Sequence, residues 1–428
     1  MKLADIQHVH MVGIGGIGMS GLARLYLHEG KEVSGSDSVP SGITVALERE
    51  GIRFCLEQVA GNISDDVDLV VYTEAIPKDH PELLAAGEKG IETINYFEAL
   101  GMVANEYYLI AVAGSHGKTT TTAMLIDILE EGSLDPTAIV GSLRTRTHSN
   151  FRAGKSKYFI AEACEYRRDF LSLTPDLLVI TNIEAEHLDY YKDLQDVQNG
   201  FRELGSRVRE GGNIIARTSD PNVAPVLDGL GVEVVDYKKY FDPSLQLTQP
   251  GLHNQLNAAA AAAAAATLGV STPVIREALE NFAGTWRRFE YKGELNGAPV
   301  YDDYGHHPSE IVATLTGARE RHPGARIVLV FQPHLASRTA KLKDDFITAL
   351  SQADRLILTD AYAARKQDTE GLESKALAEM IQRVHTDTRH IESFDAIAAV
   401  LKSGVTKDDV VIIMGAGTIT KLATQVIV

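Results

Sequence analysis

The sequence predicts an α/β fold of three domains, each built around a largely parallel sheet. Three observations carry this prediction: two apolar strands that each break into a glycine-rich turn and resume as a helix, and a later alternation of strands with helices. The turns begin at Gly13 and Gly114, and the alternation starts at Pro299. A chain of 428 residues is long enough for about three domains of roughly 150 residues each.

The stretch from His10 to Asp37 carries the first turn. Gly13, Gly15 and Gly18 form a G-x-G-x-x-G pattern between a strand and a helix, and Asp37 ends the next short strand. Such a pattern lets backbone N–H groups approach a diphosphate, while the acidic residue can accept a ribose hydroxyl. It indicates a nucleotide-diphosphate site, with a close-packed strand–helix turn as the alternative.

The stretch from Tyr107 to Leu129 carries the second turn, where G-S-H-G-K-T separates an apolar strand from a helix. Gly114 and Gly117 allow backbone N–H groups to surround phosphate oxygens, Lys118 adds a positive charge, and Thr119 offers a hydroxyl to Mg²⁺. The standard phosphate loop has a further glycine that this chain lacks. The order of strand, loop, Lys-Thr and helix still favours a nucleoside triphosphate site over a plain glycine-rich turn.

Two later strands end in polar side chains. The predicted strand Lys157–Ala163 carries Glu162, and the predicted strand Asp176–Ile183 is followed by Glu184 and His187. Because the carboxyl ends of parallel strands meet at one edge of a sheet, we expect these side chains to converge on the phosphate loop. Glu162 and His187 are therefore candidate Mg²⁺ ligands; the alternative for each is a solvated side chain at a strand end.

A helix that starts after Gly251 carries Asn254 and Asn257 ahead of the alanine run Ala258–Ala266. Residues three apart lie on one face of a helix, so both amides can reach the same nucleotide. Capping of the helix start is the alternative for these asparagines.

In the alternation of strands and helices that starts at Pro299, several strands are followed by polar loops. We expect strands at Pro299–Tyr301, Arg326–Phe331, Leu356–Thr359 and Asp409–Met414, and loops at Asp302–Pro308, Gln332–Thr339 and Gly415–Thr418. In these loops His306, His307, His334 and Arg338 can bind a small carboxylate, the arginine through its forked guanidinium. Capping of the loops by the histidines is the alternative.

The bulk composition narrows the classes of partner. A net charge of -17 without a Lys/Arg-rich stripe disfavours nucleic acid. The contents of 44% hydrophobic and 23% charged residues are typical of globular proteins, and no apolar run is long enough to insert in a membrane. Two cysteines, Cys55 and Cys164, and the lack of a secretory segment favour the cytoplasm. Either a monomer or a dimer is compatible with the sequence.

Together these motifs resemble the Mur ligase family of peptidoglycan synthesis, nearly from end to end. The resemblance rests on HMVGIGGIGMSGLA, AGSHGKTTTTAML, VITNIEAEHLDYY, LHNQLNAAAA, RRFE, DDYGHHPSEI, FQPH with SRT, and the closing MGAGTI. DDYGHHP and FQPH look like the members that add L-alanine, not those that add glutamate, a diamino acid or a dipeptide. The resemblance implies a ligase that uses ATP and Mg²⁺ to join L-alanine to the lactyl carboxylate of UDP-N-acetylmuramate through an acyl phosphate.

The resemblance also implies roles for individual residues. The UDP-sugar site would comprise Gly13, Gly15, Gly16, Ile17, Gly18, Met19, Asp37, Thr73, Ala75 and Ile76. The ATP site would comprise Gly114, Ser115, His116, Gly117, Lys118, Thr119, Thr120, Asn254, Asn257 and Asp303, with Mg²⁺ held by Thr119, Glu162 and His187. The amino acid site would comprise Tyr304, His306, His334 and Arg338. The catalytic residues would be Lys118, Glu162, His187 and Arg288, the last acting on the γ-phosphate.

The motifs divide the chain into three predicted domains. Residues 1–106 form a Rossmann-like domain for the UDP sugar, 107–286 a central P-loop domain with a parallel sheet for ATP, and 287–428 a Rossmann-like domain for the amino acid. We expect the third domain to close over the second, because the reacting groups come from all three and must meet in a dry cleft.

Two places depart from the family pattern. Glu162–Phe170 reads EACEYRRDF where an EADESD-like run is common, so both glutamates remain while their surroundings differ. Leu335 and Ala336 replace an arginine and a tyrosine found in many members. The lost positive charge leaves Arg338 to hold the amino acid carboxylate, so selectivity for L-alanine over glycine or L-serine stays open.

Three other functions are alternatives at this point. A related ligase that adds a muropeptide to the same sugar would need more basic residues around the histidines. A nicotinamide-dependent oxidoreductase would explain the first glycine-rich turn and leave the second turn and the C-terminal domain unexplained. A catalytically inactive binding module is disfavoured by the presence of Lys118, Glu162 and His187.

Overall fold

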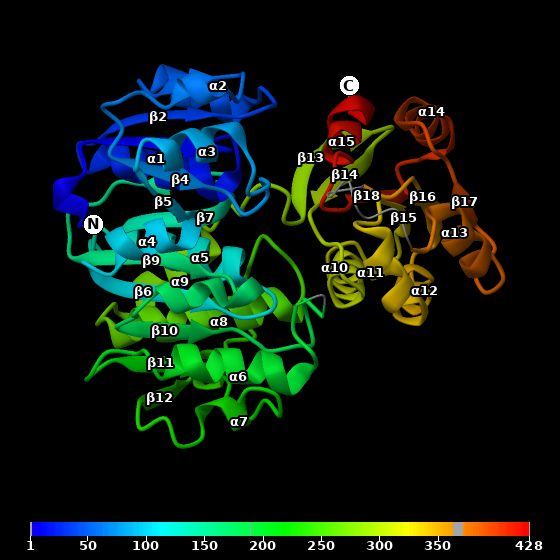
Figure 1. Cartoon of the computed structure of the whole chain (residues 1–428). Helices are drawn as coiled ribbons and strands as arrows, with labels where there is room; N and C mark the ends of the chain where they lie inside the picture. The colour runs from blue at the N-terminus through cyan, green and yellow to red at the C-terminus, as the bar shows by residue number, and fades with distance from the viewer. Residues whose placement is uncertain (1, 189, 363–370, 428) are drawn as a thin grey trace. The chain divides into compact units, whose positions relative to one another are not determined.

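The described strands form three separate sheets, each with helices packed against it (Figure 1). The structure is a computed structural model that describes residues 2–188, 190–362 and 371–427. Neighbouring strands pair in parallel except at two hairpins, β7–β8 and β13–β14, which confirms the predicted α/β class.

The described chain divides into two compact units by its internal contacts. The first unit comprises Met1–Gln246 and Leu256–Ala283, and the second comprises Leu247–Gln255 and Gly284–Val428. The first two sheets lie in the first unit and the third sheet in the second. The segment 247–255, inside the range predicted for the central domain, groups with the second unit.

The first sheet has five parallel strands in the order β3-β2-β1-β4-β5. They are β1 (His8–Val12), β2 (Glu32–Ser36), β3 (Arg53–Cys55), β4 (Leu69–Tyr72) and β5 (Glu92–Asn95). The helices are α1 (Ile17–His28), α2 (Gly42–Arg49), α3 (Pro81–Glu88) and α4 (Tyr96–Ala104). The central strand β1 is buried along its whole length, as expected for a parallel strand covered on both faces. The first glycine-rich turn therefore lies at the carboxyl edge of this sheet.

The second sheet has seven strands in the order β12-β11-β10-β6-β9-β7-β8. They are β6 (Tyr108–Ala113), β7 (Thr137–Arg144), β8 (Ser149–Arg152), β9 (Tyr158–Ala163), β10 (Leu177–Ile180), β11 (Asn213–Ala216) and β12 (Glu233–Asp236). The helices are α5 (Lys118–Glu131), α6 (Leu194–Gly205), α7 (Ala224–Leu227), α8 (Leu252–Thr267) and α9 (Thr272–Glu280). Strands β9 and β10 flank β6, so the residues after all three meet beside the phosphate loop.

The third sheet has six strands in the order β13-β14-β18-β15-β16-β17. They are β13 (Glu290–Leu295), β14 (Ala298–Asp303), β15 (Arg326–Phe331), β16 (Arg355–Leu358), β17 (Thr388–His390) and β18 (Asp409–Met414). The helices are α10 (Pro308–Arg321), α11 (Ala336–Lys341), α12 (Lys343–Leu350), α13 (Ser374–Gln382), α14 (Phe394–Gly404) and α15 (Thr420–Val426). Two apolar clusters cover the two faces of this sheet.

Two of the predicted loops begin differently in the structure. Asp302 and Asp303, which the sequence analysis places in a loop, end strand β14, where they pair in parallel with Ile413 and Met414 of β18. Helix α11 occupies part of the predicted loop Gln332–Thr339. Pairing inside the sheet overrides the low strand preference of aspartate.

Among the described helices, none has both the length and the apolar character that crossing a bilayer requires.

Candidate active site

The phosphate loop joins the end of β6 to the start of α5, and its two key glycines are required by the local geometry. Gly114 and Gly117 have φ of 138° and 82°, a region that favours glycine. A side chain at Gly114 would collide with the hydroxyl of Thr181, and one at Gly117 would collide with the amide of Asn257. Asn257 thus lies against the loop, and Lys118 is the first residue of α5.

The loop is braced by the residues that follow β10. The backbone N–H of His116 donates to Asn182 Oδ1 at 3.0 Å, and the Asn182 amide donates back to the His116 carbonyl at 3.0 Å. The N–H of Ser115 donates to the Asn182 carbonyl at 3.0 Å, and the N–H of Glu184 donates to Ser115 Oγ at 2.8 Å. These bonds tie the phosphate loop to the segment that follows β10.

Lys118 is held by a buried carboxylate. Its ammonium donates to Glu165 Oε2 at 2.8 Å and to the Ser115 carbonyl at 3.1 Å. Burial by itself lowers the pKa of Lys118, but the acidic groups around it, Glu165 foremost with Cys164 and Glu162, together outweigh burial and leave the pKa raised. Burial likewise favours neutral Glu165, yet Lys118 and His187 hold its pKa well below the usual range. Both partners are therefore charged, and Lys118 carries its positive charge at the loop.

Thr119 and Glu162 form an oxygen-rich pair beside Lys118. Thr119 Oγ1 donates to Glu162 Oε2 at 3.0 Å, and the backbone N–H of Gly141 donates to the other carboxylate oxygen. A Cβ at Gly141 would lie 2.7 Å from Glu162, so glycine makes room for the carboxylate. His187, the third predicted metal ligand, lies against Glu165, with Nε2 3.3 Å from Oε1. The structure groups two of the predicted ligands and places the third on a different carboxylate.

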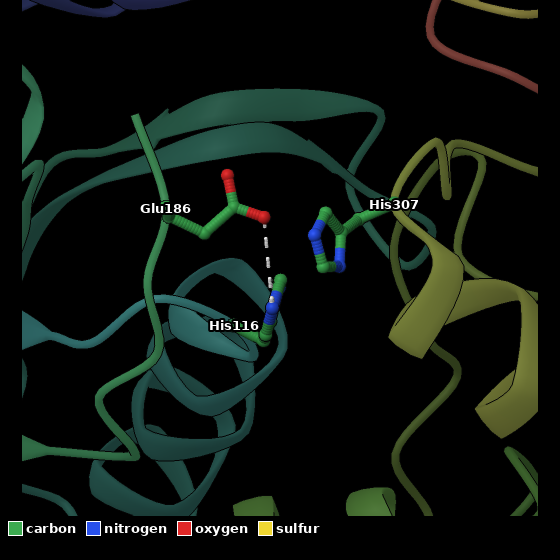
Figure 2. Close-up of side chains that lie close together, drawn as sticks. All are labelled: His116, Glu186 and His307. Carbon is green, nitrogen blue, oxygen red and sulfur yellow. Dashed lines mark ion pairs between the residues drawn. The ribbon is translucent and has the colours of Figure 1, made fainter. Parts of the chain in front are cut away.

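The His116 side chain is directed at acidic residues of the β10 loop. Figure 2 shows its imidazole facing the Glu186 carboxylate, with Nε2 3.9 Å from Oε1; Glu184 lies at 3.4 Å. His307, also drawn there, belongs to the second unit, where its Nδ1 lies 2.7 Å from Ser309 Oγ at the start of α10.

The first glycine-rich turn forms a compact cradle between β1 and α1. Gly13 has φ of 81°, and a side chain there would collide with Thr73, which follows β4. The N–H of Gly15 donates to Asp37 Oδ2 at 2.9 Å, so Asp37 holds the turn itself. The other predicted contacts lie at the end of the turn and in the first turn of α1 (Gly16, Ile17, Gly18 and Met19), or in the loop after β4 (Ala75 and Ile76).

In the second unit, the predicted amino acid residues gather beyond β14 and β15. The His306 ring centroid lies 5.4 Å from that of His334 and 5.6 Å from that of Tyr304. The pKa of His306 is lowered to about 3, chiefly by burial and also by Arg338 and His334, while Glu310 opposes the shift. His306 is therefore neutral at physiological pH.

The guanidinium of Arg338 is a further part of the predicted amino acid site. Among the described residues, its Nη1 is buried and has no hydrogen-bond partner. A buried guanidinium nitrogen of this kind suits a carboxylate ligand. Nearby, Tyr362 stacks on His334 at 6.0 Å and lines a cavity of about 570 Å³ that Gln332 and Thr418 also border. Two of the predicted polar loops thus meet at one cavity.

The predicted ribose and γ-phosphate residues also lie in the second unit. Asp303 accepts from the backbone N–H of Phe289 at 2.8 Å and of Gly305 at 2.7 Å. Burial raises the pKa of Asp303 to about 6, although Arg288 opposes the shift. The Arg288 guanidinium lies 5.2 Å from the Tyr304 ring centroid. Asn254, on the first turn of α8, donates to the Pro250 carbonyl at 2.9 Å.

Sequence reasoning missed three neighbours of these sites. The ring of Tyr96 packs against Gly18, where a Cβ would lie 3.0 Å from it. Asn150 is buried on β8 and accepts from Arg24 Nη1 of α1 at 2.7 Å, which ties the second sheet to the first. Arg167 reaches the loop after β4. No local motif marks Tyr96 or Asn150, and Arg167 stands out only within the departure at 162–170.

Three family domains match successive parts of the chain. The Mur ligase family catalytic domain matches residues 8–108, the Mur ligase middle domain 112–242, and the Mur ligase glutamate ligase domain 287–417.

Relatives match along almost the whole length. The UDP-N-acetylmuramate–L-alanine ligase of Agathobacter rectalis is 41% identical over 448 residues, covering 98% of this chain and 97% of the relative. The ligase of the same name from Acetivibrio thermocellus is 41% identical over 446 residues, covering 97% and 94%.

Solved structures agree with these matches. The UDP-N-acetylmuramate-alanine ligase of Thermotoga maritima has a TM-score of 0.82 at 27% identity, covering 98% of each chain. The murein peptide ligase of Psychrobacter arcticus shares the fold, with a TM-score of 0.73 at 24% identity. Identity that extends from the first glycine-rich turn to the last strand cannot come from a shared fold alone, and this chain belongs to the Mur ligase family.

Proposed function

We propose that this chain is an ATP-dependent ligase that joins L-alanine to the lactyl carboxylate of UDP-N-acetylmuramate. The observation that carries the proposal is the group of Lys118, Thr119 and Glu162 at the strand ends of the second sheet. A charged lysine, a hydroxyl and a carboxylate around a glycine-rich loop suit the terminal phosphates of a nucleotide. The acceptor and the amino acid are supported by the activity in the names of relatives 41% identical to this chain.

In the first proposed step, a lactyl carboxylate oxygen attacks the γ-phosphorus of ATP. The bond from this phosphorus to the β–γ bridging oxygen breaks, and ADP leaves with the electron pair. Lys118 and the backbone N–H groups of Gly114–Thr120 would offset the charge that gathers on the transferred phosphoryl group. Glu165 would keep Lys118 charged and pointed at the loop. The product is an acyl phosphate.

In the second step, the neutral amine of L-alanine attacks the acyl carbon. The bond to the phosphate oxygen breaks, inorganic phosphate leaves with the electron pair, and the amine loses a proton as the amide forms. Arg338 would hold the carboxylate of the amino acid through its Nη1, which has no hydrogen-bond partner among the residues that the structure describes. A neutral His306 would add no positive charge beside the amine. Arg288 would act on the γ-phosphate and Asp303 on the ribose of the nucleotide.

We also propose Mg²⁺ between Thr119 and Glu162. Two oxygen donors 3.0 Å apart match the preference of this ion, and Glu162 is oriented by the Gly141 N–H. His187 would join them only after leaving Glu165. When bound, the ion would supply charge neutralisation at the β- and γ-phosphates.

We propose the domain limits 1–106, 107–286 and 287–428, for the UDP sugar, ATP and the amino acid respectively. The proposed substrates are nucleotide-linked metabolites, so we place the reaction in the cytoplasm.

The proposal is tested by measuring phosphate release from ATP with Mg²⁺ and UDP-N-acetylmuramate. Parallel reactions contain L-alanine, glycine, L-serine, L-glutamate or a muropeptide-type tripeptide. We expect release with L-alanine that depends on the UDP sugar, and the other amino acids rank the selectivity. Release with the tripeptide alone would instead assign the chain to the muropeptide-adding ligases, and no release in any reaction would refute a ligase.

Lys118→Ala tests the nucleotide site within this assay. Loss of the loop cation is expected to lower turnover by at least about 100-fold, the usual effect of removing a group that stabilises transition-state charge. Circular dichroism checks that the variant is folded. Normal turnover in a folded variant would refute the role of the phosphate loop.

A further inference from the structure

The acceptor proposed above is strongly anionic, and it would bind to a first unit that also carries a group of neighbouring carboxylates. Its diphosphate matches the glycine turn that begins at Gly13, while its lactyl carboxylate must reach the loop at Lys118. Glu74, Glu98 and Asp169 lie near one another in this part of the first unit. In a chain with a net charge of -17, an approaching carboxylate needs a local cation.

Arg167 is a cation beside these carboxylates. Its Nη1 lies 3.0 Å from Glu74 Oε2. Glu74 follows Thr73, which packs on Gly13 of the cradle. Arg167 itself comes two residues after Glu165, the carboxylate that holds Lys118. The Arg167 guanidinium therefore links the loop after β4, which contacts the first glycine-rich turn, to the segment that carries Glu165.

The backbone at Arg167 is held in an unfavourable conformation. Arg167 and Arg168 have φ of 54° and 61°, so two consecutive non-glycine residues are left-handed. Arg168 is anchored away from the cradle, bonded to Asp196 at 2.8 Å and to Glu203 at 2.9 Å on α6. The sharp turn sends Arg167 to the other side, toward Glu74. A strained backbone persists only where the surrounding structure maintains it, and such positions are found preferentially at functional sites.

The ion pair with Glu74 is too exposed to explain the strained turn. The Arg167 side chain is 50% exposed and that of Glu74 is 34% exposed, and pairs in such positions contribute little to stability. The guanidinium also lies over the Tyr166 ring, 5.7 Å from its centroid, a second contact that favours its observed position. Arg167 is thus preorganised, and exchange of Glu74 for another carboxylate costs little.

We propose that Arg167 binds the lactyl carboxylate of the acceptor by exchanging it for Glu74, and so delivers it to the phosphate loop. This inference rests on the proposed function. The forked guanidinium suits two carboxylate oxygens, and an arginine here belongs to the EACEYRRDF departure of this chain. Arg167 is then a substrate-binding residue that discriminates UDP-N-acetylmuramate from UDP sugars without a carboxylate.

Calorimetric titration with two nucleotide sugars tests the proposal. UDP-N-acetylglucosamine lacks the lactyl carboxylate and serves as the matched ligand. Arg167→Gln is expected to weaken UDP-N-acetylmuramate binding about tenfold or more, the usual value of a charge-assisted hydrogen bond. Arg167→Gln is expected to leave the affinity for UDP-N-acetylglucosamine within about twofold. Arg167→Lys, which keeps the positive charge but not the forked guanidinium, is expected to bind UDP-N-acetylmuramate with an affinity between those of the parent and Arg167→Gln.

Glu74→Gln distinguishes substrate binding by Arg167 from a structural latch, meaning a purely structural role of the Arg167–Glu74 ion pair. This variant breaks the same ion pair and leaves Arg167 in place, so UDP-N-acetylmuramate should bind as well as before or more tightly. An equal loss in Glu74→Gln and Arg167→Gln, or a loss shared by both nucleotide sugars, would overturn the proposal in favour of a latch. Unchanged binding in Arg167→Gln would overturn it as well. Failure of the unaltered chain to bind UDP-N-acetylmuramate at all would overturn the proposed function and this inference together.

Discussion

A single buried carboxylate organises the residues around the phosphate loop. Glu165 is 1% exposed and contacts both Lys118 and His187. A buried charge is tolerated only when it is paired, so Lys118 keeps the Glu165 carboxylate charged, and the carboxylate keeps Lys118 charged. Lys118 is therefore held in its charged form, with its ammonium directed at the carbonyls of the glycine-rich loop.

The second unit should show a pH response that originates at His306. Its pKa is lowered to about 3 in the folded protein against about 6.5 when unfolded. The stability contributed by its neutral form is complete above about pH 6.5 and is lost as pH falls toward 3, because the unfolded chain binds the proton first. Between pH 7.5 and 5.5 this loss is about 1 kcal/mol.

His306→Asn tests this linkage by urea denaturation at the two pH values. The variant should lose about 1 kcal/mol less than the parent between pH 7.5 and 5.5. Asp303 has a pKa raised to about 6, so its contribution to the free energy of unfolding increases as pH falls. Because both proteins contain Asp303, this contribution cancels when the variant is compared with the parent. Identical pH dependence of the two proteins would show that His306 titrates normally.

At the scale of elements, helix α4 links the first sheet to the segment that carries Glu165. It follows β5 directly, and its Gly101 faces the Ser172 carbonyl at the end of the 3₁₀ segment Tyr166–Ser172. A Cβ at this glycine would collide with that backbone oxygen. The close approach fixes the segment that also presents Arg167, so packing here bears on the proposed acceptor site.

Gly101→Ala should therefore destabilise the protein, against the usual preference of helices for alanine. We expect a loss of about 1–3 kcal/mol in the free energy of unfolding, the range seen for overpacked sites. Gly87→Ala on α3 is the matched control, because a Cβ there meets open space, and it should gain about 0.5–1 kcal/mol. Equal effects of the two substitutions in urea titrations would contradict the close packing of α4.

At the scale of the whole molecule, the cores follow the two compact units. One apolar cluster contains residues of both the first and second sheets, among them Met11 and Phe159. The third sheet has its own clusters on its two faces. Proteins whose cores are separate need not unfold in one cooperative step. The first two sheets should therefore unfold together and the third sheet independently.

Differential scanning calorimetry should show two transitions, the larger from the first unit because enthalpy scales with the number of residues. UDP-N-acetylmuramate alone should raise the Tm of the larger transition and leave the other in place, since a ligand stabilises the unit that binds it. One transition, or three, would show that the described cores do not set the cooperative units.

The sequence by itself determined the elements of this fold and the residues of its turns. Strands such as Arg326–Phe331 and Asp409–Met414 are short apolar runs, and the structure confirms both ranges. The turns at Gly13 and Gly114 were predictable because only glycine tolerates their positive φ and tight packing. These signals are local, so they can be read without knowing what lies nearby in space.

Only the tertiary structure decided which partners these residues meet. Glu165 joins Lys118 to His187, and Asn150 joins β8 to α1, across gaps in sequence that no spacing reveals. Asp303 was predicted in a loop and ends a strand, because pairing with β18 outweighs its own preference. Periodicity and turn chemistry are encoded in neighbouring residues, whereas ion pairs and close approaches depend on how whole sheets and helices pack, which the local sequence does not specify.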